Sequence, residues 1–293
     1  WLLDEEITVR GDWAVRRPTV PPGGWAFEFD NDGYPDTDDT AEVILALRRV
    51  GRGDGAVGAD GVDGAIGRAT RWLLGMQSRD GGWAAFDADN TREMARKLPF
   101  CDFGEVIDPP SADVTAHVVE ALAHEGLGDS EPVRRGVRWL RQAQELDGSW
   151  FGRWGANYIY GTGAAVPAMV AAGVPGDDPA IGRALSWLRA RQNADGGWGE
   201  DLRSYRDPSQ AGRGVSTASQ TAWALLALLA AGENTEAVRR GVDFLVSTQR
   251  PDGSWDEPYF TGTGFPGHFY INYHLYRLVF PLSALGRYLG GTP

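Results

Sequence analysis

The chain has 293 residues, which is enough for one large domain or two small ones with a substantial core. Its 40 acidic residues outnumber its 28 lysines and arginines, and it has no dense basic tract, so we expect no nucleic-acid partner. The single cysteine, Cys101, excludes an internal disulfide framework, and no apolar run is long enough to span a bilayer, so we expect a cytoplasmic or membrane-peripheral protein.

The first segment, "WLLDEEITVRGDW" (residues 1–13), matches the end of a repeat that recurs four times further along the chain. Glu6 stands where the other copies have Gln, and Gly11 and Trp13 supply the closing Gly and Trp. The outer helix of this copy is cut short, and no initiator Met opens the chain. We therefore expect part of a longer product, with a barrel that is incomplete at its N-terminus.

The next element begins with three aspartates in four positions, within "YPDTDDTAEVILALRRV" (residues 34–50). Asp36 and Asp39 form a capping-box-like start, and negative charge suits a helix N-terminus. A proton donor is a second interpretation. An acid that protonates an alkene must be neutral yet strongly acidic, which requires burial, neighbouring carboxylates and a cationic partner. Asp38 and its neighbours supply the carboxylates.

Calcium binding is a third interpretation of the same cluster. The segment "EFDNDGYPDTDD" from Glu28 places oxygens at EF-hand positions 1, 3 and 5, Gly33 at position 6 and Asp39 at position 12. However, position 1 is Glu rather than Asp, position 8 is Pro35, and position 12 lacks the bidentate Glu. These departures disfavour calcium, and we expect no metal here.

Four segments share a basic residue, a small residue, an aromatic followed by Leu, a Gln five positions after the aromatic, and Gly-x-Trp. The aromatic, Leu and Gln recur at helical spacing, and the Asp-Gly after each Gln supplies a stop and a turn. Each repeat should therefore end a helix in a clasp of Gln and Trp. The repeats are "RATRWLLGMQSRDGGW" (68–83), "RGVRWLRQAQELDGSW" (135–150), "RALSWLRARQNADGGW" (183–198) and "RGVDFLVSTQRPDGSW" (240–255).

More apolar segments lie between these amphipathic outer helices. Such alternation predicts concentric helical layers rather than an open solenoid. We therefore expect an all-α fold, an α/α barrel of the α6-α6 toroid type, with no convincing strand. The expected inner helices cover residues 40–50, 114–124, 164–172, 217–231 and 270–288.

The segment "PFCDFGEVIDPPSADVTAHVVEAL" (residues 99–122) supplies a candidate cation. Asp113 and His117 are four residues apart on a predicted helix and therefore lie on one face. The carboxylate can hold the imidazole protonated and oriented, which makes His117 a candidate partner of the aspartates. A core histidine without a chemical role is the alternative.

Four aromatic residues near the C-terminus, Phe265, Phe269, Tyr273 and Tyr276, are spaced four, four and three residues apart. This spacing predicts one stripe along a helix. Such a stripe of aromatic residues more often packs in the hydrophobic core than lines a binding site. Beside a proton donor, however, ring faces would stabilise migrating positive charge without acting as nucleophiles.

With these motifs, the chain resembles the squalene–hopene cyclases, bacterial class II triterpene cyclases, along essentially its whole length. The repeats are similar to the Gln-Trp motifs of that family, and "DTDD" is similar to its DxDD motif. "DTDDTA" differs from the single-aspartate DCTA motif of oxidosqualene cyclases, and plant-type diterpene cyclases lack the segment around residues 101–117. Protein prenyltransferases hold zinc with Asp, Cys and His, but their Asp-x-Cys pairing is absent here. Three long matches carry the resemblance: "GGWAFEFDNDGYPDTDDTA", "PFCDFGEVIDPPSADVTAH" and "GTGFPGHFYINYHLYRLVFP".

The resemblance implies a role for each matching residue. Asp38 would be the catalytic acid, Asp36 and Asp39 its flanking carboxylates, and His117 its charged partner, oriented by Asp113. Cys101 would lie with Phe100 near the cavity entrance, and the aromatic residues would line the cavity. Phe86 stands where some relatives carry Tyr, so a π-face is kept and a hydroxyl is lost. The implied substrate-binding residues are Phe27, Phe86, Phe100, Cys101, Trp154, Phe265, Phe269, Tyr273 and Tyr276.

The resemblance also implies a cyclase catalytic domain over residues 1–293, similar to the C-terminal half of the family's members. Asp38 would protonate a terminal alkene of squalene or a related polyprenoid, which cyclises through carbocations without an organic cofactor or metal. In the family, an N-terminal barrel absent here completes the cavity, and the enzyme is monotopic on the cytoplasmic side of the bacterial membrane. A monodomain cyclase of a shorter polyprenoid, an inactive fragment and a non-catalytic binding module are alternatives, and a homodimer stays open.

Overall fold

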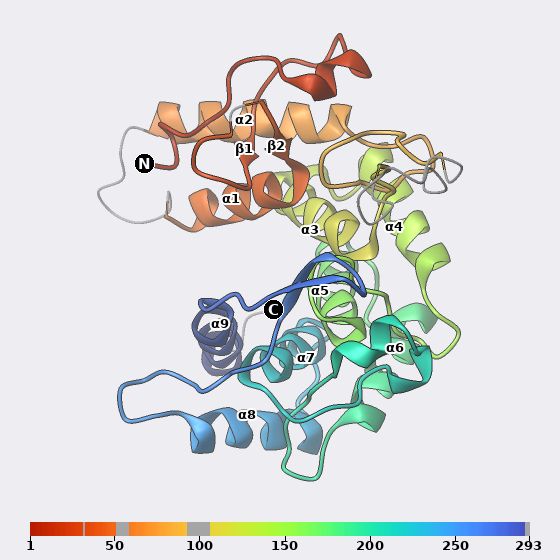
Figure 1. The fold of residues 1–293 in the computed structure, drawn as a ribbon, viewed down its shortest axis with the longest axis vertical. Helices are drawn as coiled ribbons and strands as arrows, with labels where there is room; N and C mark the ends of the chain where they lie inside the picture. The colour runs from red at the N-terminus through yellow and green to blue at the C-terminus, as the bar shows by residue number, and fades with distance from the viewer. Residues whose placement is uncertain (32, 51–58, 93–105, 291–293) are drawn as a thin grey trace. The chain divides into compact units, whose positions relative to one another are not determined.

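The computed structural model describes residues 1–31, 33–50, 59–92 and 106–290, and Figure 1 shows their helices and strands. The chain divides into two compact units, Trp1–Leu140 and Arg141–Pro293. Each unit has its own helices and its own buried apolar residues. Phe100 and Cys101, two of the expected substrate-binding residues, lie outside the described residues.

In the first unit, α1 (Thr37–Val50) packs against α3 (Ala112–Leu122). α3 is buried along almost its whole length, because its residues are nearly all small or apolar. α2 (Ala59–Gly75) packs on α1, and α4 (Glu131–Ala143) buries only one face. Among the described helices of the first unit, α3 is therefore the most deeply buried, whereas α1 and α4 each bury one face.

Two contacts fix the direction of α1 relative to α3. Asp38, at the start of α1, contacts His117 on α3. Arg48, near the end of α1, makes two hydrogen bonds of 2.6 Å to the carboxylate of Glu125, just after α3. Residue numbers rise together along the two helices, so α1 and α3 run parallel.

In the second unit, α7 (Ala218–Ala230) packs on both α5 (Tyr158–Ala171) and α9 (Tyr276–Gly290) (Figure 1). α5 and α7 are buried on nearly all sides. α6 (Pro179–Arg191) and α8 (Glu236–Thr248) keep polar faces. Short 3-10 helices at Leu202–Tyr205 and Pro208–Gln210 precede α7, and another at Asp12–Val15 lies in the first unit. The alternation of buried and amphipathic helices agrees with the sequence-based prediction.

The predicted Gln-Trp clasps are confirmed. In the first repeat, Gln77 Nε2 donates to the carbonyl oxygens of Gly81 (2.9 Å) and Pro132 (2.8 Å), which joins the end of α2 to the start of α4. Trp83 is fully buried and donates from Nε1 to the carbonyl oxygen of Leu73 at 2.7 Å. Gln144 and Gln192 repeat the two glutamine bonds, and Trp198 and Trp255 repeat the tryptophan bond. Each clasp therefore fixes the C-terminal end of an outer helix.

The helices differ from the predicted ranges mainly at their N-terminal ends. α1 begins at Thr37 rather than at residue 40, because the side chain of Asp36 accepts hydrogen bonds from the first turn. α5 begins at Tyr158 rather than at residue 164, and the carboxylate of Glu200 accepts a 2.9 Å hydrogen bond from the backbone of Ile159.

The expectation of no strand is wrong, as is that of a helical aromatic stripe. β1 (Trp25–Ala26) pairs with β2 (Pro35–Asp36), and β3 (Gly262–Phe265) pairs with β4 (Phe269–Ile271), both antiparallel. The second pair places Phe265 and Phe269 on opposite strands of a hairpin. Its turn contains Pro266 and Gly267, and Gly267 has a φ of +84° that a helix does not allow. Helix α9 therefore begins at Tyr276, not at residue 270.

Candidate active site

The N-terminal end of α1 gathers the three aspartates. β2 ends at Asp36, whose Oδ1 accepts backbone hydrogen bonds from Asp38 (2.6 Å) and Asp39 (3.1 Å). Only 4% of Asp36 is exposed. The capping interpretation is therefore correct for Asp36, which supports the turn that presents the other two aspartates.

Asp38 faces the neighbouring inner helix. Its Oδ1 lies 2.6 Å from Nδ1 of His117, and the two side chains are 22% and 13% exposed. Burial lowers the pKa of His117, but the charge and hydrogen bond of Asp38, followed by the charges of Glu42 and Asp113, override it and raise this pKa to about 10. The contact and the raised pKa favour a charged imidazole beside Asp38 at neutral pH, and the role of His117 as the partner of a catalytic acid stays a prediction.

The other two aspartates hold protons more strongly than ordinary carboxyl groups. Burial, followed by the charges of Asp39 and Asp38, raises the pKa of Asp36 well above its usual range. Burial, followed by the charges of Asp38 and Glu42, raises the pKa of Asp39 to about 7, although His117 opposes this effect. The cluster therefore retains protons near neutral pH beside a fixed cation, which suits a proton donor.

Asp113 is fully buried at the start of α3. Its Oδ1 accepts hydrogen bonds from the Ser111 hydroxyl (2.6 Å) and from the backbone N–H of Val114 (3.1 Å). Its charge contributes to the raised pKa of His117. Asp113 therefore supports the charged form of the imidazole, and orientation of the ring by Asp113 stays a prediction.

Sequence reasoning missed Glu42, which follows Asp38 by one helical turn on α1. Its Oε1 lies 3.9 Å from Nδ1 of His117. The pKa of Glu42 is raised above its usual value by burial, against the opposing charge of His117, although 56% of the side chain is exposed. The i, i+4 spacing after Asp38 in "DTDDTAE" was the signal that could have identified Glu42.

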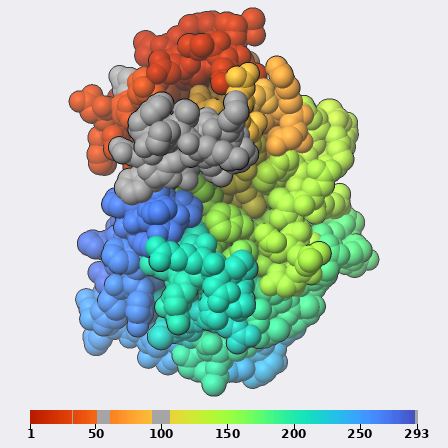
Figure 2. All heavy atoms as spheres, turned by 45° about the vertical axis from the view of Figure 1, so that its right-hand side comes forward, coloured from red at the N-terminus to blue at the C-terminus, as the bar shows by residue number. Residues whose placement is uncertain are grey.

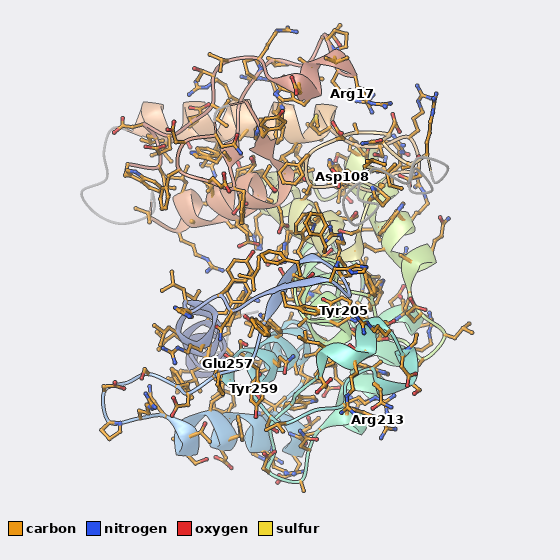
Figure 3. All side chains as sticks on the ribbon, viewed as in Figure 1. Arg17, Asp108, Tyr205, Arg213, Glu257 and Tyr259 are labelled. Atoms are coloured by element: carbon orange, nitrogen blue, oxygen red, sulfur yellow. The ribbon has the colours of Figure 1, made fainter. Side chains whose placement is uncertain are left out.

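Two of the predicted aromatic residues lie in the first unit. Phe27 directly follows β1 and is 53% exposed. Phe86 lies in the loop after Trp83, and its backbone N–H donates to Oδ2 of Asp108 at 2.6 Å. Asp108, labelled in Figure 3, also accepts from the backbone of Asp87 and so holds this loop in place.

The other described aromatic residues lie in the second unit. Phe265 and Phe269 have ring centroids 6.5 Å apart, and Tyr273 stacks on Tyr276 at 4.7 Å. The guanidinium group of Arg153 lies 4.2 Å from the ring centroid of Trp154. These residues therefore form local groups within one unit rather than one helical stripe.

Tyr205, labelled in Figure 3, connects two of these groups. Its hydroxyl donates to the carbonyl oxygen of Gly155 at 2.8 Å and thus braces the turn that carries Trp154. Its ring lies 5.9 Å from that of Tyr270 on β4, the strand that also carries Phe269. Tyr205 is therefore a support for both the turn and the hairpin.

Sequence reasoning also missed an aromatic cluster around Trp223 on α7. The ring of Trp223 contacts those of Tyr160 (4.7 Å between centroids), Tyr276 (5.9 Å) and Phe280 (5.4 Å). Trp223 lies in the long apolar run of α7, where sequence alone indicates only core. Its partner rings come from two other helices, α5 and α9, and no local spacing reveals these contacts.

The described residues contain no group of three or more His, Cys, Asp or Glu side chains arranged to hold a metal ion. The side-chain oxygen of Asp36 that faces its own helix accepts backbone hydrogen bonds.

The family model for the squalene–hopene cyclase C-terminal domain matches residues 1–290. Squalene–hopene cyclase from Alicyclobacillus acidocaldarius is 62% identical over 290 residues, covering 98% of this chain and 45% of that protein. The squalene–hopene cyclase from Bradyrhizobium diazoefficiens is 52% identical over 293 residues, covering 98% of this chain and 44% of that protein. The chain thus spans less than half the length of these relatives.

Solved structures of type II terpene cyclases have a fold similar to that of this chain. A variant of the type II terpene cyclase MstE from Scytonema, in complex with its substrate geranylgeranyl dihydroxybenzoate, aligns with a TM-score of 0.65 at 21% identity. The alignment covers 95% of this chain and 80% of that one. This likeness shows the fold alone, and it confirms the predicted α/α-barrel class.

Proposed function

Because the chain belongs to the squalene–hopene cyclase C-terminal domain family, we propose that it carries the acid centre of a class II terpene cyclase. The protein would convert squalene into hopene-type polycyclic triterpenes. The observation that carries this proposal is the 2.6 Å contact between Asp38 and His117 beside two proton-retaining aspartates. The domain would extend over residues 1–293.

The proposed first step is proton transfer from Asp38 to a terminal carbon–carbon double bond. The π-electrons of the alkene form the new C–H bond, the other alkene carbon becomes a cation, and Asp38 is left as a carboxylate. The imidazolium of His117 stabilises that carboxylate through Oδ1. Successive double bonds then attack the cation, and proton loss or capture of water ends the reaction.

The aromatic residues of the second unit would stabilise the later cations. An aromatic ring face attracts a cation by about 2 kcal/mol or more when water is excluded, without forming a covalent bond. Trp154, Phe265, Phe269, Tyr273 and Tyr276 are the rings for which we propose this role. Trp223 joins them because its ring contacts Tyr276 at 5.9 Å.

We further propose that the protein works at a membrane surface on the cytoplasmic side. Squalene is almost insoluble in water, so a cyclase that uses it must draw it from a bilayer. In the part of the chain that the structure describes, no helix has the length and apolarity needed to cross a membrane. A peripheral position on the membrane surface would give access to squalene without a helix that crosses the bilayer.

Incubation of the purified protein with squalene in heavy water tests the proposal. We expect a polycyclic product, identified by mass analysis of the extract, that carries solvent deuterium at the carbon protonated first. The acid exchanges its proton with solvent before each turnover, so the label must appear. Recovery of unchanged squalene, with conversion of a shorter polyprene instead, would favour a cyclase of a smaller substrate. No conversion of either by the full-length protein would contradict the cyclase assignment.

A further inference from the structure

The acid centre contains a second carboxylate that faces the same imidazole. Asp38 and Glu42 are separated by one helical turn and share a face of α1. Their oxygens lie 2.6 Å and 3.9 Å from the same Nδ1 atom of His117 on α3. Two carboxyl groups from one helix therefore flank one cation from the other.

This arrangement addresses a difficulty in the proposed reaction. Asp38 must carry a proton before it can donate one, and a neutral Asp38 no longer supplies a negative charge to His117. His117 is only 13% exposed, and burial opposes its charged form. Without another anion nearby, the imidazole would lose its proton at the stage when its charge is needed.

We propose that Glu42 is a positioning residue of the acid centre, which keeps His117 charged and directed at Asp38 while Asp38 carries the proton for the alkene. The proposal rests on the function proposed above. Of the charges other than Asp38 that favour the charged form of His117, that of Glu42 is the strongest and that of Asp113 follows. Glu42 does not touch the reacting atoms in this scheme and acts only through His117.

The charge on Glu42 is coupled to the proton on Asp38. A negative Asp38 raises the pKa of Glu42, so protonation of Asp38 removes that effect and favours ionised Glu42. When Asp38 is protonated, Glu42 is therefore more readily ionised, so one negative charge remains beside the imidazolium of His117. The groups that act on His117 or Glu42 from the facing helices are Asp38, Asp39 and Arg49 on α1 and Asp113 and Glu120 on α3.

The test is a histidine titration in the full-length protein. Asp38→Asn mimics the neutral acid, and NMR of isotope-labelled histidine then reports the pKa of His117, assigned by the signal that His117→Ala removes. We expect Glu42→Gln, added to Asp38→Asn, to lower this pKa by about one unit or more, because a charge about 4 Å away is lost. Glu42→Asp, which restores the charge, should recover most of the shift.

The control is Glu131→Gln in the same Asp38→Asn background. Glu131 is 57% exposed, much like Glu42, and pairs with Arg134 and Arg138 on α4. The Glu131→Gln substitution should leave the pKa of His117 unchanged. Equal pKa values for His117 with and without Glu42→Gln would overturn the proposal. Circular dichroism of each variant ensures that the comparison is made between folded proteins.

Activity measurements separate this proposal from the cyclase assignment. In the protein with Asp38 intact, Glu42→Gln should slow the consumption of squalene, move the activity optimum to lower pH and leave the product ratio unchanged. A protein that shows the titration shift but converts no substrate would refute the cyclase assignment alone. An active cyclase in which Glu42→Gln alters neither the titration nor the pH profile would refute the role of Glu42 alone.

Discussion

The Nδ1 atom of His117 lies 2.6 Å from Oδ1 of Asp38, although the two residues are 79 positions apart. The contact depends on two local features. Asp36 caps α1 and thereby fixes the turn that carries Asp38, and α3 packs parallel to α1 with His117 at the matching level. A helix cap and a helix pair together place an acid beside a cation.

His117→Ala should slow consumption of squalene by about 100-fold, within the range for loss of a group that assists proton transfer. The product ratio should stay the same, because the imidazolium acts only on the first protonation. Substrate consumption and product composition are measured in one extract. His124→Ala is the control, since His124 is 54% exposed and follows α3. A normal rate with new ring systems would contradict this role.

Asp39→Asn should stabilise the protein in a pH-dependent manner. The pKa of folded Asp39 is about 7 and its ordinary value is 3.8, so between these values the folded state binds the extra proton. The stability of the unmodified protein should therefore fall as pH rises through this window. The gain in Tm on substitution should be greater at about pH 8 than at about pH 4, by roughly 2 °C or more. Asp4→Asn, at a side chain that is 91% exposed, should show no such trend.

Phe269→Ala should change the products more than it changes stability. Removal of a fully buried Phe costs roughly 3–5 kcal/mol, but Phe269 is 51% exposed, so we expect a loss of roughly 2 kcal/mol or less. If its ring stabilises a cation, partially cyclised products should accumulate while substrate is still consumed. Phe265→Ala should act in the same way with a larger loss of stability, because Phe265 is less exposed. An unchanged product ratio in both variants would assign these rings to packing.

Chelation should not affect activity. The acid centre is interpreted as three aspartates and a histidine that exchange protons, so turnover should be the same before and after treatment with EDTA. Loss of activity in EDTA, restored by calcium, magnesium or zinc, would instead indicate a metal site.

The helices and the clasps could be predicted from the sequence because both depend on local spacing. The Gln and Trp of each repeat lie close together in the chain, and the pattern occurs in four copies. The hydrogen bond from Gln77 to Gly81 is an example of such a local contact. The aspartate cap at Asp36 was equally local. In Figure 2 the atoms of the second unit, coloured from green to blue, form a closely packed body of their own.

The features that the sequence did not reveal depend on contacts between distant segments. The spacing of Asp113 and His117 made His117 a candidate partner of the aspartates, but its pairing with Asp38 in particular came from the family resemblance. The approach of Glu42 to His117 requires the parallel packing of α1 on α3. The aromatic spacing from Phe265 imitated a helix, although Pro266 and Gly267 are turn signals that pointed to a hairpin.

The most direct test of the account is the turnover of squalene by Asp38→Asn in the full-length protein, compared with the unmodified protein and with Asp4→Asn at equal folded concentration. The amide keeps the shape of the carboxyl group but cannot supply the proton, so we predict a loss of about 1,000-fold or more with an unchanged helical spectrum. Asp4→Asn should be fully active. Undiminished cyclisation by a folded Asp38→Asn variant would show that the proton comes from another group and would contradict the account.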